Sequence, residues 1–536
     1  MTPTAKGEPP QVQREPERTP ASPSCASNLI DWLRDYAGRR IHSRLIDERR
    51  CIPPYVVLDF GNRGLLGMQV AAEDGGKLAL STFDTLRIQR QLGAIDLTLA
   101  FFVGLNNALG IRPIQKYGAP GVRERYLPDL AAGRMLAAFA LTERDAGSNP
   151  LNMTSAAGCL GDGRYVLNGE KIWSGSASWA GVVNVFARLA GAGGHDAGHI
   201  AFCLPLDRPG VSQGPEALTM GLRGMVQNSI AFDAVVLEEE DVLGARGAGL
   251  AVAADAMMLG RLGIAATCVG AMLRALQLVS RYARRRHVNA GPLSDNDLVR
   301  TQVASLASAA LVAGETVDVL AAHIDAGTHV PNEAYACVKA ACSEWLWEAA
   351  DRLVQVLGGR GYMETNCAAQ LLRDARIARL FEGPTETLYV FVGKRVLEGS
   401  PAYFQYLEHA LGGKPLADEL RGALGGLGQR FERDGHERAQ VENRLAYLAG
   451  ELAALYLACA CSRTLPPYAR EWLRGRIASV PLGRGARTPV TELERGALDQ
   501  AIARQIGDLE QTLPGEDVQL DAYLRKSWPL QGAGAS

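Results

Sequence analysis

Residues 373–386 read RDARIARLFEGPTE, and this stretch sets how the rest of the chain is interpreted. Within it, Glu382 stands between an aromatic residue and a Gly-Pro pair. Three arginines precede Glu382 at helical spacing, and such a pattern is typical of a solvated, salt-bridged helix face. The alternative is a carboxylate that abstracts a proton at an active site. Motifs elsewhere in the chain are needed to choose between these two interpretations.

A second motif lies upstream, where residues 140–149 read ALTERDAGSN and residues 161–173 read GDGRYVLNGEKIW. Thr142 and Ser148 place hydroxyls beside glycine-rich backbone, which suits hydrogen bonding to the polar edge of a ring and to phosphate oxygens. Residues 165–169 are predicted to form a strand that ends in a tight Asn-Gly turn. Trp173 is then expected on the next strand, either as ordinary core or packed against an aromatic ring system.

Two further motifs follow along the chain. Residues 260–265 read GRLGIA and residues 282–287 read YARRRH, in which Arg286 offers a planar fork that binds phosphate bidentately. A basic helix end, favoured by the helix dipole, is the alternative. Residues 355–362 read QVLGGRGY, whose glycines permit close approach of the backbone to a ligand. A turn that ends a helix has a similar composition.

In this order and at these distances the four motifs resemble those of the acyl-CoA dehydrogenase family, over about residues 28 to 400. The resemblance implies FAD as cofactor, and it implies that Glu382 removes the α-proton of an acyl thioester while the flavin takes the β-hydride. It implies that Arg261 and Gly383 contact the substrate. No metal site is expected. The residues that it implies for FAD binding are Phe139, Leu141, Thr142, Gly147, Ser148, Trp173, Ser174, Arg286, Gln355, Gly358, Gly359, Thr385 and Glu386.

The chain departs from the family pattern at several of these places. Gly175 stands where the family has a threonine that bonds the flavin, so that Ser174 or Ser176 is expected to substitute for it. Arg286 is the arginine that, in the family, reaches the FAD pyrophosphate of a neighbouring subunit. The other departures are Arg144 in place of a proline, Asn289 in place of an aromatic residue, and Pro384 in place of threonine or serine.

The predicted fold is mainly α with a central β-barrel domain. Apolar residues at helical spacing from Leu29 to Tyr36 predict a first helix, with Asn28 as its cap. Alternating short runs at 182–187, 200–204 and 229–232 predict strands. The expected parts are a disordered tail (1–27), an N-terminal helical domain (28–137), a β-barrel domain (138–245), a C-terminal four-helix bundle (246–400) and an additional helical domain (401–536).

Composition restricts the class of protein. The chain has 536 residues, a net charge of −2 and 47% hydrophobic residues, so a large globular protein without a nucleic-acid-binding function is expected. No uninterrupted apolar run reaches the length of a membrane span, and residues 1–27 lack the apolar core of a secretory signal. Ten cysteines without regular spacing predict reduced thiols and a cytoplasmic location.

Residues 401–536 extend beyond the common form of the family. They carry sixteen basic and seventeen acidic residues, which excludes a basic nucleic-acid module. An apolar helix face in this extension needs a partner, either the bundle or a second subunit. By analogy with very-long-chain family members that carry such extensions, a homodimer is expected. The face comprises Leu445, Leu448, Leu452, Leu455 and Tyr456.

The expected function is FAD-dependent α,β-dehydrogenation of an acyl thioester to the trans-2-enoyl thioester, in fatty acid metabolism. The thioester handle is either coenzyme A or an acyl carrier protein, and an electron-transfer flavoprotein is the expected electron acceptor. A flavin-dependent acyl thioester oxidase and a non-catalytic flavoprotein of the same fold are the alternatives. A flavin monooxygenase is disfavoured because such members lack a glutamate at the position of Glu382.

Overall fold

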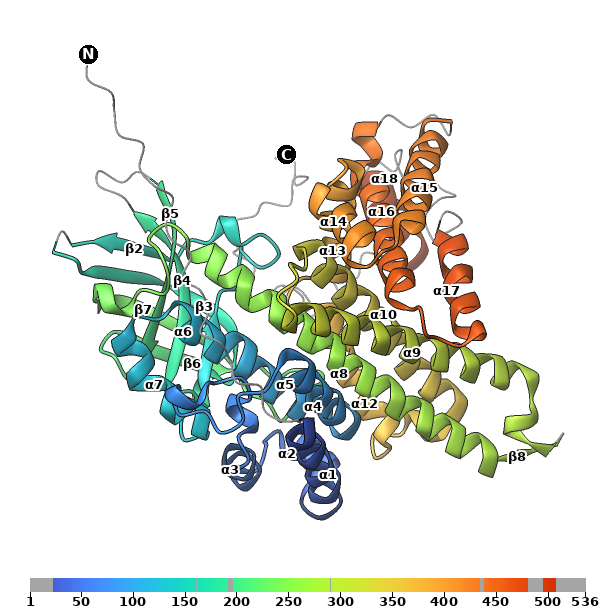
Figure 1. Ribbon diagram of the computed structural model, residues 1–536, viewed down its shortest axis with the longest axis horizontal. Helices are drawn as coiled ribbons and strands as arrows, with labels where there is room; N and C mark the ends of the chain where they lie inside the picture. Colours follow the sequence, from blue (N-terminus) through green and yellow to red (C-terminus); the bar gives the residue numbers. More distant parts are fainter. Residues whose placement is uncertain are drawn as a thin grey trace.

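The computed structural model describes residues 23–160, 162–190, 196–289, 291–433, 438–480 and 495–507. One sheet domain lies beside two groups of helices, and the C-terminal extension forms a further group of helices against the long ones (Figure 1). The predicted fold class, mainly α with a central β domain and additional C-terminal helices, is confirmed.

Helices make up the N-terminal part. The first begins at Pro23, a residue favoured in the first turn of a helix, so the last residues of the predicted tail are helical and Asn28 lies inside the helix instead of capping it. Residues 1–22 lie outside the described part. The helices are α1 (Pro23–Arg40), α2 (Ser43–Arg49), α3 (Pro54–Asn62), α4 (Thr82–Ile95), α5 (Leu97–Leu105), α6 (Arg112–Tyr117) and α7 (Pro120–Ala132).

The β domain is a seven-stranded sheet with the order β1-β4-β2-β3-β7-β6, in which β5 pairs with β4. β1 and β2 run parallel to β4, and the other pairs are antiparallel. The three predicted strands are confirmed within β4, β5 and β7. The strands are β1 (Ala137–Ala140), β2 (Ala156–Cys159), β3 (Tyr165–Gly175), β4 (Val182–Ala190), β5 (Asp196–Pro205), β6 (Val211–Glu216) and β7 (Gln227–Leu237).

The turn predicted at Asn168-Gly169 is wrong. Strand β3 runs through both residues, and its register against β7 shifts there, as in a β-bulge. Gly169 has φ +145°, and the side chain of Asn168 accepts a hydrogen bond from the Ala234 N–H at 2.8 Å. The extra residue lies in β7, where Asp233 and Ala234 stand opposite Asn168, so the conformational freedom of Gly169 accommodates a bulge of the partner strand instead of a turn. Trp173 lies further along β3.

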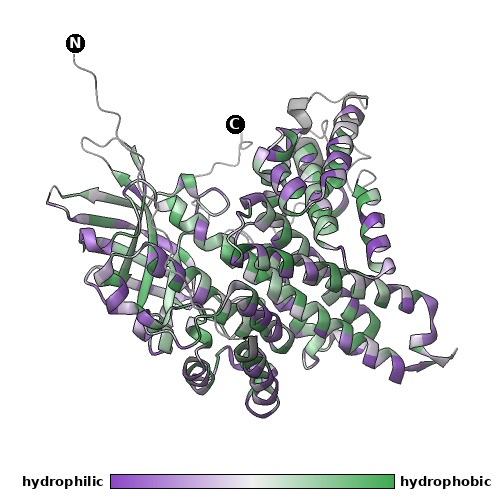
Figure 2. Cartoon of the chain, viewed as in Figure 1, coloured by the Kyte–Doolittle hydropathy of each residue, from purple (hydrophilic) through white to green (hydrophobic). Residues whose placement is uncertain are grey.

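Long helices form the bundle. Helix α8 packs against α4, α9 and α10, and α10 also packs against α13. Hydrophilic residues gather at the free tip of α8, beside the short strands β8 (His287–Val288) and β9 (Gly291–Pro292) (Figure 2). The bundle and the helices around it are α8 (Gly249–Arg285), α9 (Asp297–Asp325), α10 (Asn332–Leu357), α11 (Gly359–Tyr362), α12 (Cys367–Ala375) and α13 (Thr385–Leu397).

Four helical stretches are long and apolar enough to cross a bilayer by length and composition: Leu97–Tyr117, Gly249–Arg285, Asp297–Asp325 and Glu442–Cys461. The expectation from the sequence concerned uninterrupted apolar runs, whereas these four stretches qualify by average hydropathy, which tolerates a few charged residues. Between 56% and 78% of each apolar window is buried inside the protein. Packing within the fold thus accounts for much of this apolarity.

The extension packs on the bundle. Its described helices are α14 (Pro401–Gln405), α15 (Lys414–Arg433), α16 (Arg438–Cys461), α17 (Pro467–Ser479) and α18 (Arg495–Ile506). Helix α16 lies on α13 and α10, and α17 lies on α9. A Cβ added to Gly393 would overlap the Ala446 carbonyl, and one added to Gly450 would overlap the Tyr389 carbonyl, so α13 and α16 touch through their backbones. The apolar face of α16 therefore packs on the bundle.

Candidate active site

The loop that carries Glu382 has an unusual backbone. It connects the short helix η9 (Arg376–Arg379) to α13, with φ of +51° at Glu382 and +100° at Gly383. A positive φ is uncommon for a residue with a side chain, and it often marks a functional site. The turn directs the Glu382 side chain at helix α8, where a Cβ added to Gly260 would lie 2.7 Å from Oε1 and 2.8 Å from Cδ. The missing side chain at Gly260 therefore provides the space for the carboxylate.

Two cations hold the backbone of this loop. Arg261 on α8 donates from Nε to the carbonyl oxygen of Glu382 at 3.1 Å. Lys339 on α10 donates from Nζ to the carbonyl oxygen of Gly383 at 2.7 Å. Lys339 is fully buried. Consecutive carbonyl groups are thus bound from two helices, which stabilises the left-handed turn.

The carboxylate itself has no polar partner among the described residues. Both Oε atoms of Glu382 are buried and accept no hydrogen bond. Burial raises the pKa of Glu382 to about 8, against the opposing attraction of Arg261 and Lys339. The salt-bridged helix face is wrong for this residue, because its carboxylate is buried and Arg373 and Arg379 pair instead with Asp47 and Glu344. A desolvated carboxyl group that titrates near neutral pH suits proton abstraction.

The two segments of the upstream motif lie side by side. The Leu141 carbonyl accepts from Lys171 Nζ at 3.2 Å, and the Thr142 carbonyl accepts from the Ile172 N–H at 2.9 Å. Glu143 also binds Lys171, at 2.8 Å. Burial alone would raise the pKa of Glu143. Attraction to Lys171 and the hydrogen bonds that Glu143 accepts from Lys171, Thr154 and Ser155 outweigh burial and lower this pKa to about 2. An ionised pair therefore fixes the start of the motif.

Trp173 and Ser174 place an exposed aromatic ring beside a buried hydroxyl group. Trp173 has φ +54° and is 53% exposed, which is unusual for so large an apolar side chain. Ser174 beside it is buried, and its Oγ has no partner among the described residues. The N–H of Ser176 donates to the Val226 carbonyl at 2.7 Å. An exposed indole next to a buried, unsatisfied hydroxyl fits a bound aromatic group with polar edges.

Helix α5 connects this surface with Glu382. Phe102 makes an edge contact with Trp179, at 6.2 Å between ring centroids. Phe101, the preceding residue, makes an edge contact with Phe381 at 5.0 Å. Phe381 directly precedes the candidate base. The sheet segment that ends near Trp179 and the Glu382 loop therefore pack against the same helix.

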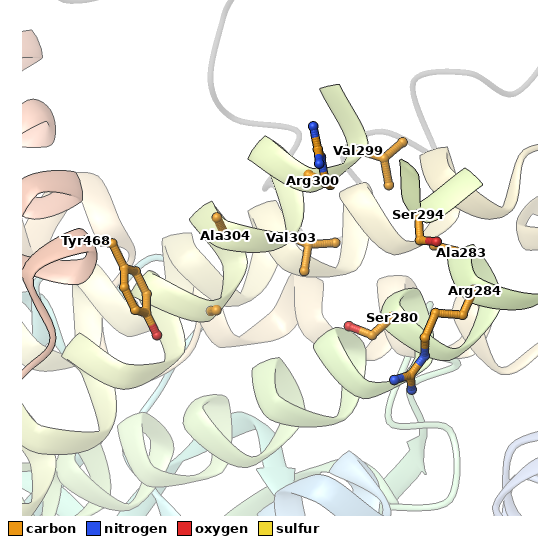
Figure 3. A pocket seen from close by; sticks show the side chains of 10 residues that line it. Ser280, Ala283, Arg284, Ser294, Val299, Arg300, Val303, Ala304 and Tyr468 are labelled. Carbon is orange, nitrogen blue, oxygen red and sulfur yellow. The ribbon is translucent and has the colours of Figure 1, made fainter. Parts of the chain in front are cut away.

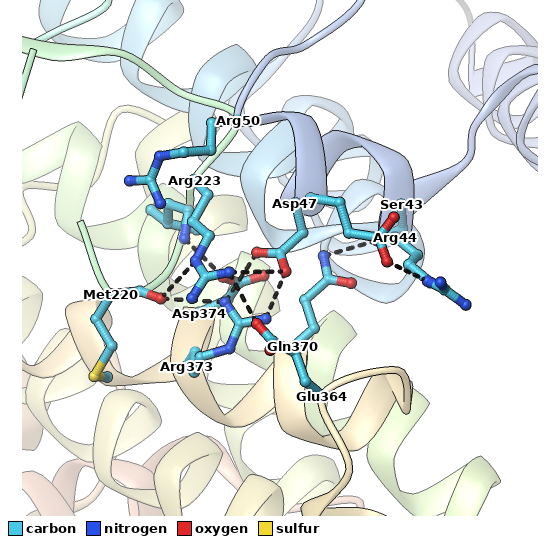
Figure 4. A network of polar contacts seen from close by, with 12 residues as sticks. Ser43, Arg44, Asp47, Arg50, Met220, Arg223, Glu364, Gln370, Arg373 and Asp374 are labelled. Atoms are coloured by element: carbon cyan, nitrogen blue, oxygen red, sulfur yellow. Dashed lines mark hydrogen bonds and ion pairs between the residues drawn. The ribbon is translucent and has the colours of Figure 1, made fainter. Parts of the chain in front are cut away.

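A polar network supports the loop before β7. In Figure 4, Arg223 and Arg373 both point at the carboxylate of Asp47, at 3.7 and 2.9 Å. The N–H of Leu222 donates to Asp374 at 2.6 Å. Burial raises the pKa of Asp374 to about 7. The network connects α2 and α12 to the loop before β7, whose Val226 carbonyl accepts from the Ser176 N–H. It therefore fixes the N-terminal helices against the bundle.

Other predicted site residues lie far from Glu382 within one chain. Arg286 caps the C-terminal end of α8, 26 residues beyond Gly260, which is about 39 Å along the helix. Gln355, Gly358 and Gly359 lie at the C-terminal end of α10, where Gly358 has φ +60°. Helix α9 reverses the chain between α8 and α10, so these two helices run in the same direction and both end away from the base. One chain does not bring these residues to Glu382.

The remaining predicted residues take mixed positions. Thr385 is buried with an unsatisfied Oγ1, whereas Glu386 beside it is exposed. Gly147 and Ser148 are exposed in the loop after Thr142, and Phe139 packs on Phe186 at 4.8 Å. A separate cavity of about 390 Å³ lies between α8, α9 and α17 (Figure 3). Its lining includes Ser280 and Arg284 from the far part of α8, Val303 from α9 and Tyr468 from α17, so it is separate from the Glu382 loop.

Lys339 was missed from the sequence, and so was the role of Gly260. Lys339 stands in an otherwise apolar run, ACVKAAC at 336–342, and a lone cation in such a run signals a buried charge that needs a partner. Gly260 was noted for its motif, but the space that it leaves depends on which residue faces it. Only the folded chain shows that this residue is Glu382.

Models of the acyl-CoA dehydrogenase N-terminal, middle and C-terminal domains match residues 26–134, 138–235 and 247–397. An acyl-CoA dehydrogenase of Bacillus subtilis is 30% identical over 370 residues, which are 69% of this chain and 97% of that protein. The chain belongs to the acyl-CoA dehydrogenase family. The match includes both the Thr142 motif and the Glu382 loop, whereas the extension lies beyond the matched domains.

Other members are also similar. The mouse very long-chain specific acyl-CoA dehydrogenase is 33% identical over 334 residues, 61% of this chain and 51% of that protein. The chain thus spans about half the length of this relative. A solved glutaryl-CoA dehydrogenase from Mycobacterium smegmatis, in complex with FADH2, has a TM-score of 0.63 and 25% identity, covering 70% of this chain and 95% of that structure.

Proposed function

We propose that this family member catalyses the FAD-dependent α,β-dehydrogenation of an acyl thioester to the trans-2-enoyl thioester. The observation that carries the proposal is the position of Glu382, a buried carboxylate without a polar partner, held in a positive-φ turn against Gly260. Such a group is costly unless a ligand or a reaction uses it. Family membership supports the reaction class.

In the proposed mechanism Glu382 accepts the α-proton of the thioester. The carboxylate is desolvated, so it binds a proton more strongly than a carboxylate in water does. Arg261 and Lys339 fix its carbonyl and the next one, which keeps the side chain on the face of α8 that Gly260 opens. The N–H of Glu382 is proposed to bind the thioester carbonyl and so acidify the α-position. Bound FAD supplies the acceptor for the β-hydride.

The residues present fit a flavin. Thr142 lies beside Ile172, close to the exposed indole of Trp173 and the unsatisfied hydroxyl of Ser174, and we propose that these residues hold the ring system. Arg286 with its phosphate-binding fork lies about 39 Å along α8 from Gly260, so we propose that it contacts the FAD of a second copy. This assignment requires at least two copies of the chain, and a homodimer is the proposed state.

Partners and location are also proposals. An electron-transfer flavoprotein is the proposed acceptor of the electrons, and the thioester handle is coenzyme A or an acyl carrier protein. All ten cysteines are unpaired, which supports a reducing compartment such as the cytoplasm.

The test is anaerobic mixing of the flavin-loaded protein with a panel of acyl thioesters on coenzyme A and on acyl carrier protein. The flavin absorbance is expected to bleach with at least one thioester, and Glu382→Gln is expected to abolish the bleaching while retaining the flavin. Bleaching that persists in Glu382→Gln would contradict the assignment of the base. Rapid reoxidation by dioxygen would indicate an oxidase.

A further inference from the structure

Lys339 is a fully buried lysine in an otherwise apolar stretch of α10. It lies in the interior of α10 and is 0% exposed. Its Nζ donates to the Gly383 carbonyl at 2.7 Å and lies 6.0 Å from the centroid of the Phe381 ring. Burying an ammonium group is costly unless it is paired. Both contacts are to the residues that immediately flank Glu382.

The titratable groups around Lys339 come from three elements. Glu382 faces it from the loop, Arg261 and Cys268 from α8, and Glu344 from its own helix. Burial is the largest cause that lowers the pKa of Lys339, and Arg261 acts in the same direction, whereas Glu382, Cys268 and Glu344 raise this pKa. In turn, Arg261 and Lys339 are the two groups that lower the pKa of Glu382 against its burial. The lysine and the carboxylate therefore act on each other's titration.

Helix α10 holds the segment that leads to Glu382 at three points, and Lys339 is the one that lies beside the carboxylate. Glu344 pairs with Arg379 at 2.5 Å, three residues before Glu382. Ser343, one turn beyond Lys339, donates to the Ala378 carbonyl at 2.9 Å and so fastens the start of the segment. A neutral donor is sufficient for that task. Lys339 fastens the end of the segment, beside the carboxylate, with an ammonium group. A purely structural role does not explain why the donor beside the Glu382 carboxylate is a charged ammonium group.

We propose that Lys339 is a positioning residue for Glu382: it fastens the Gly383 carbonyl so that the carboxylate is directed at Gly260, and its positive charge favours the ionised form of that carboxylate. The proposal rests on the proposed function, since it assigns a role within the same site. It adds a second cation to Arg261, with a different task. Arg261 holds the carbonyl of Glu382 itself, whereas Lys339 holds the next one.

The first test measures the protonation of Glu382 without turnover. Infrared pH-difference spectra of the flavin-loaded protein report the C=O stretch of the protonated carboxyl group, and Glu382→Gln identifies its band. Lys339→Met removes the charge and the donor, and Lys339→Gln keeps a donor without the charge. Both variants are expected to move the midpoint of the Glu382 titration upward, by about one pH unit, since a neighbouring opposite charge lowers a carboxyl pKa by about that much or more.

A matched control removes a lysine charge elsewhere in the bundle. Lys394 on α13 pairs with Glu442 of the extension at 2.8 Å and is well exposed. Lys394→Met is expected to leave the midpoint of the Glu382 titration unchanged. An unchanged midpoint in both Lys339 variants, with flavin retained and melting temperature near that of wild type, would overturn the proposal and leave the lysine a structural role.

The second test follows the rate of flavin bleaching against pH. If Lys339 favours ionisation of Glu382, the rate in the variants falls about tenfold near pH 7 for a one-unit shift and recovers at higher pH. If the lysine only supports the fold, the rate falls by the same factor at every pH. A pH-independent loss would therefore contradict the proposal, and the separation of kcat from KM identifies any loss of thioester binding.

A reciprocal measurement covers the case in which the Lys339 variants do not fold. In Glu382→Gln the lysine is intact, and lysine labelled with 13C at Cε reports its titration by NMR. Loss of the carboxylate is expected to lower the pKa of Lys339, and no change would overturn the proposal. The two proposals fail separately: no bleaching of wild-type flavin by any thioester would refute the proposed function, whereas the infrared and NMR titrations still decide the coupling of Lys339 to Glu382.

Discussion

Replacement of Gly260 by alanine should slow proton abstraction while leaving the fold intact. The added methyl group would lie 2.7 Å from Oε1 of Glu382 and 2.8 Å from Cδ, against an ordinary contact of 3.4 Å or more. The carboxylate therefore has to retreat by about 0.7 Å or more (3.4 minus 2.7). It is the far end of a flexible side chain, so it can move without unfolding the helix. Alanine in place of glycine in a helix interior also contributes about 1 kcal/mol of stability.

Misplacement of a reacting group by about 1 Å can cost about 10²-fold in rate. Stopped-flow bleaching of the flavin by a saturating thioester should therefore be slower by about that factor in Gly260→Ala, with a melting temperature equal to or above that of wild type. Gly314→Ala in α9 is the matched control, because its Cβ would meet only Val269 at 3.6 Å. This control should bleach at the wild-type rate. Wild-type bleaching in Gly260→Ala would refute the argument that the carboxylate uses the space at Gly260.

Three further results are expected. The pKa of Glu382 is about 8 in the folded protein and 4.5 ordinarily, so the carboxyl group ionises at lower pH in the unfolded state. The free energy of unfolding therefore falls as pH rises between these two values. Glu382→Gln lacks this loss, so its melting temperature should exceed that of wild type by more at pH 8 than at pH 5. Glu143→Ala leaves the fully buried Lys171 without its partner, and urea unfolding should show a loss of about 3–5 kcal/mol. Gly393→Ala forces α13 away from the Ala446 carbonyl and should cost about 1–3 kcal/mol in the same measurement, with an unchanged unfolding slope.

The candidate base and the order of the elements were predictable because they depend on local sequence. Glu382 was found from a motif, and the strands β4, β5 and β7 were found from alternation. The Asn168-Gly169 turn was predicted wrongly because the same backbone freedom serves a turn and a bulge, and the choice depends on the partner strand. The start of α1 at Pro23 was missed because the tail was judged from composition.

Long-range contacts account for what the sequence did not show. The apolar face of α16 was predicted, but the sequence could not show whether this face packs on the bundle or on a second subunit, because that depends on tertiary structure. The roles of Gly260 and Lys339 depend on their contacts with the Glu382 loop, which is more than 40 residues away in the chain. Arg286 was assigned by resemblance to the FAD of a neighbouring subunit, and its distance along α8 from Gly260 agrees with that expectation.

The backbone contact between α13 and α16 also restricts how this protein can change over generations. Gly393 and Gly450 each face a carbonyl of the other helix, so neither position accepts a larger residue unless the opposite helix moves. Helix α13 begins directly after the Glu382 loop, so such movements reach the candidate active site. A descendant that lost the extension would also expose the face of α13 around Tyr389, which is now buried. Substitutions in the two helices are therefore expected to be accepted in pairs, and the extension to be inherited together with the bundle as one unit.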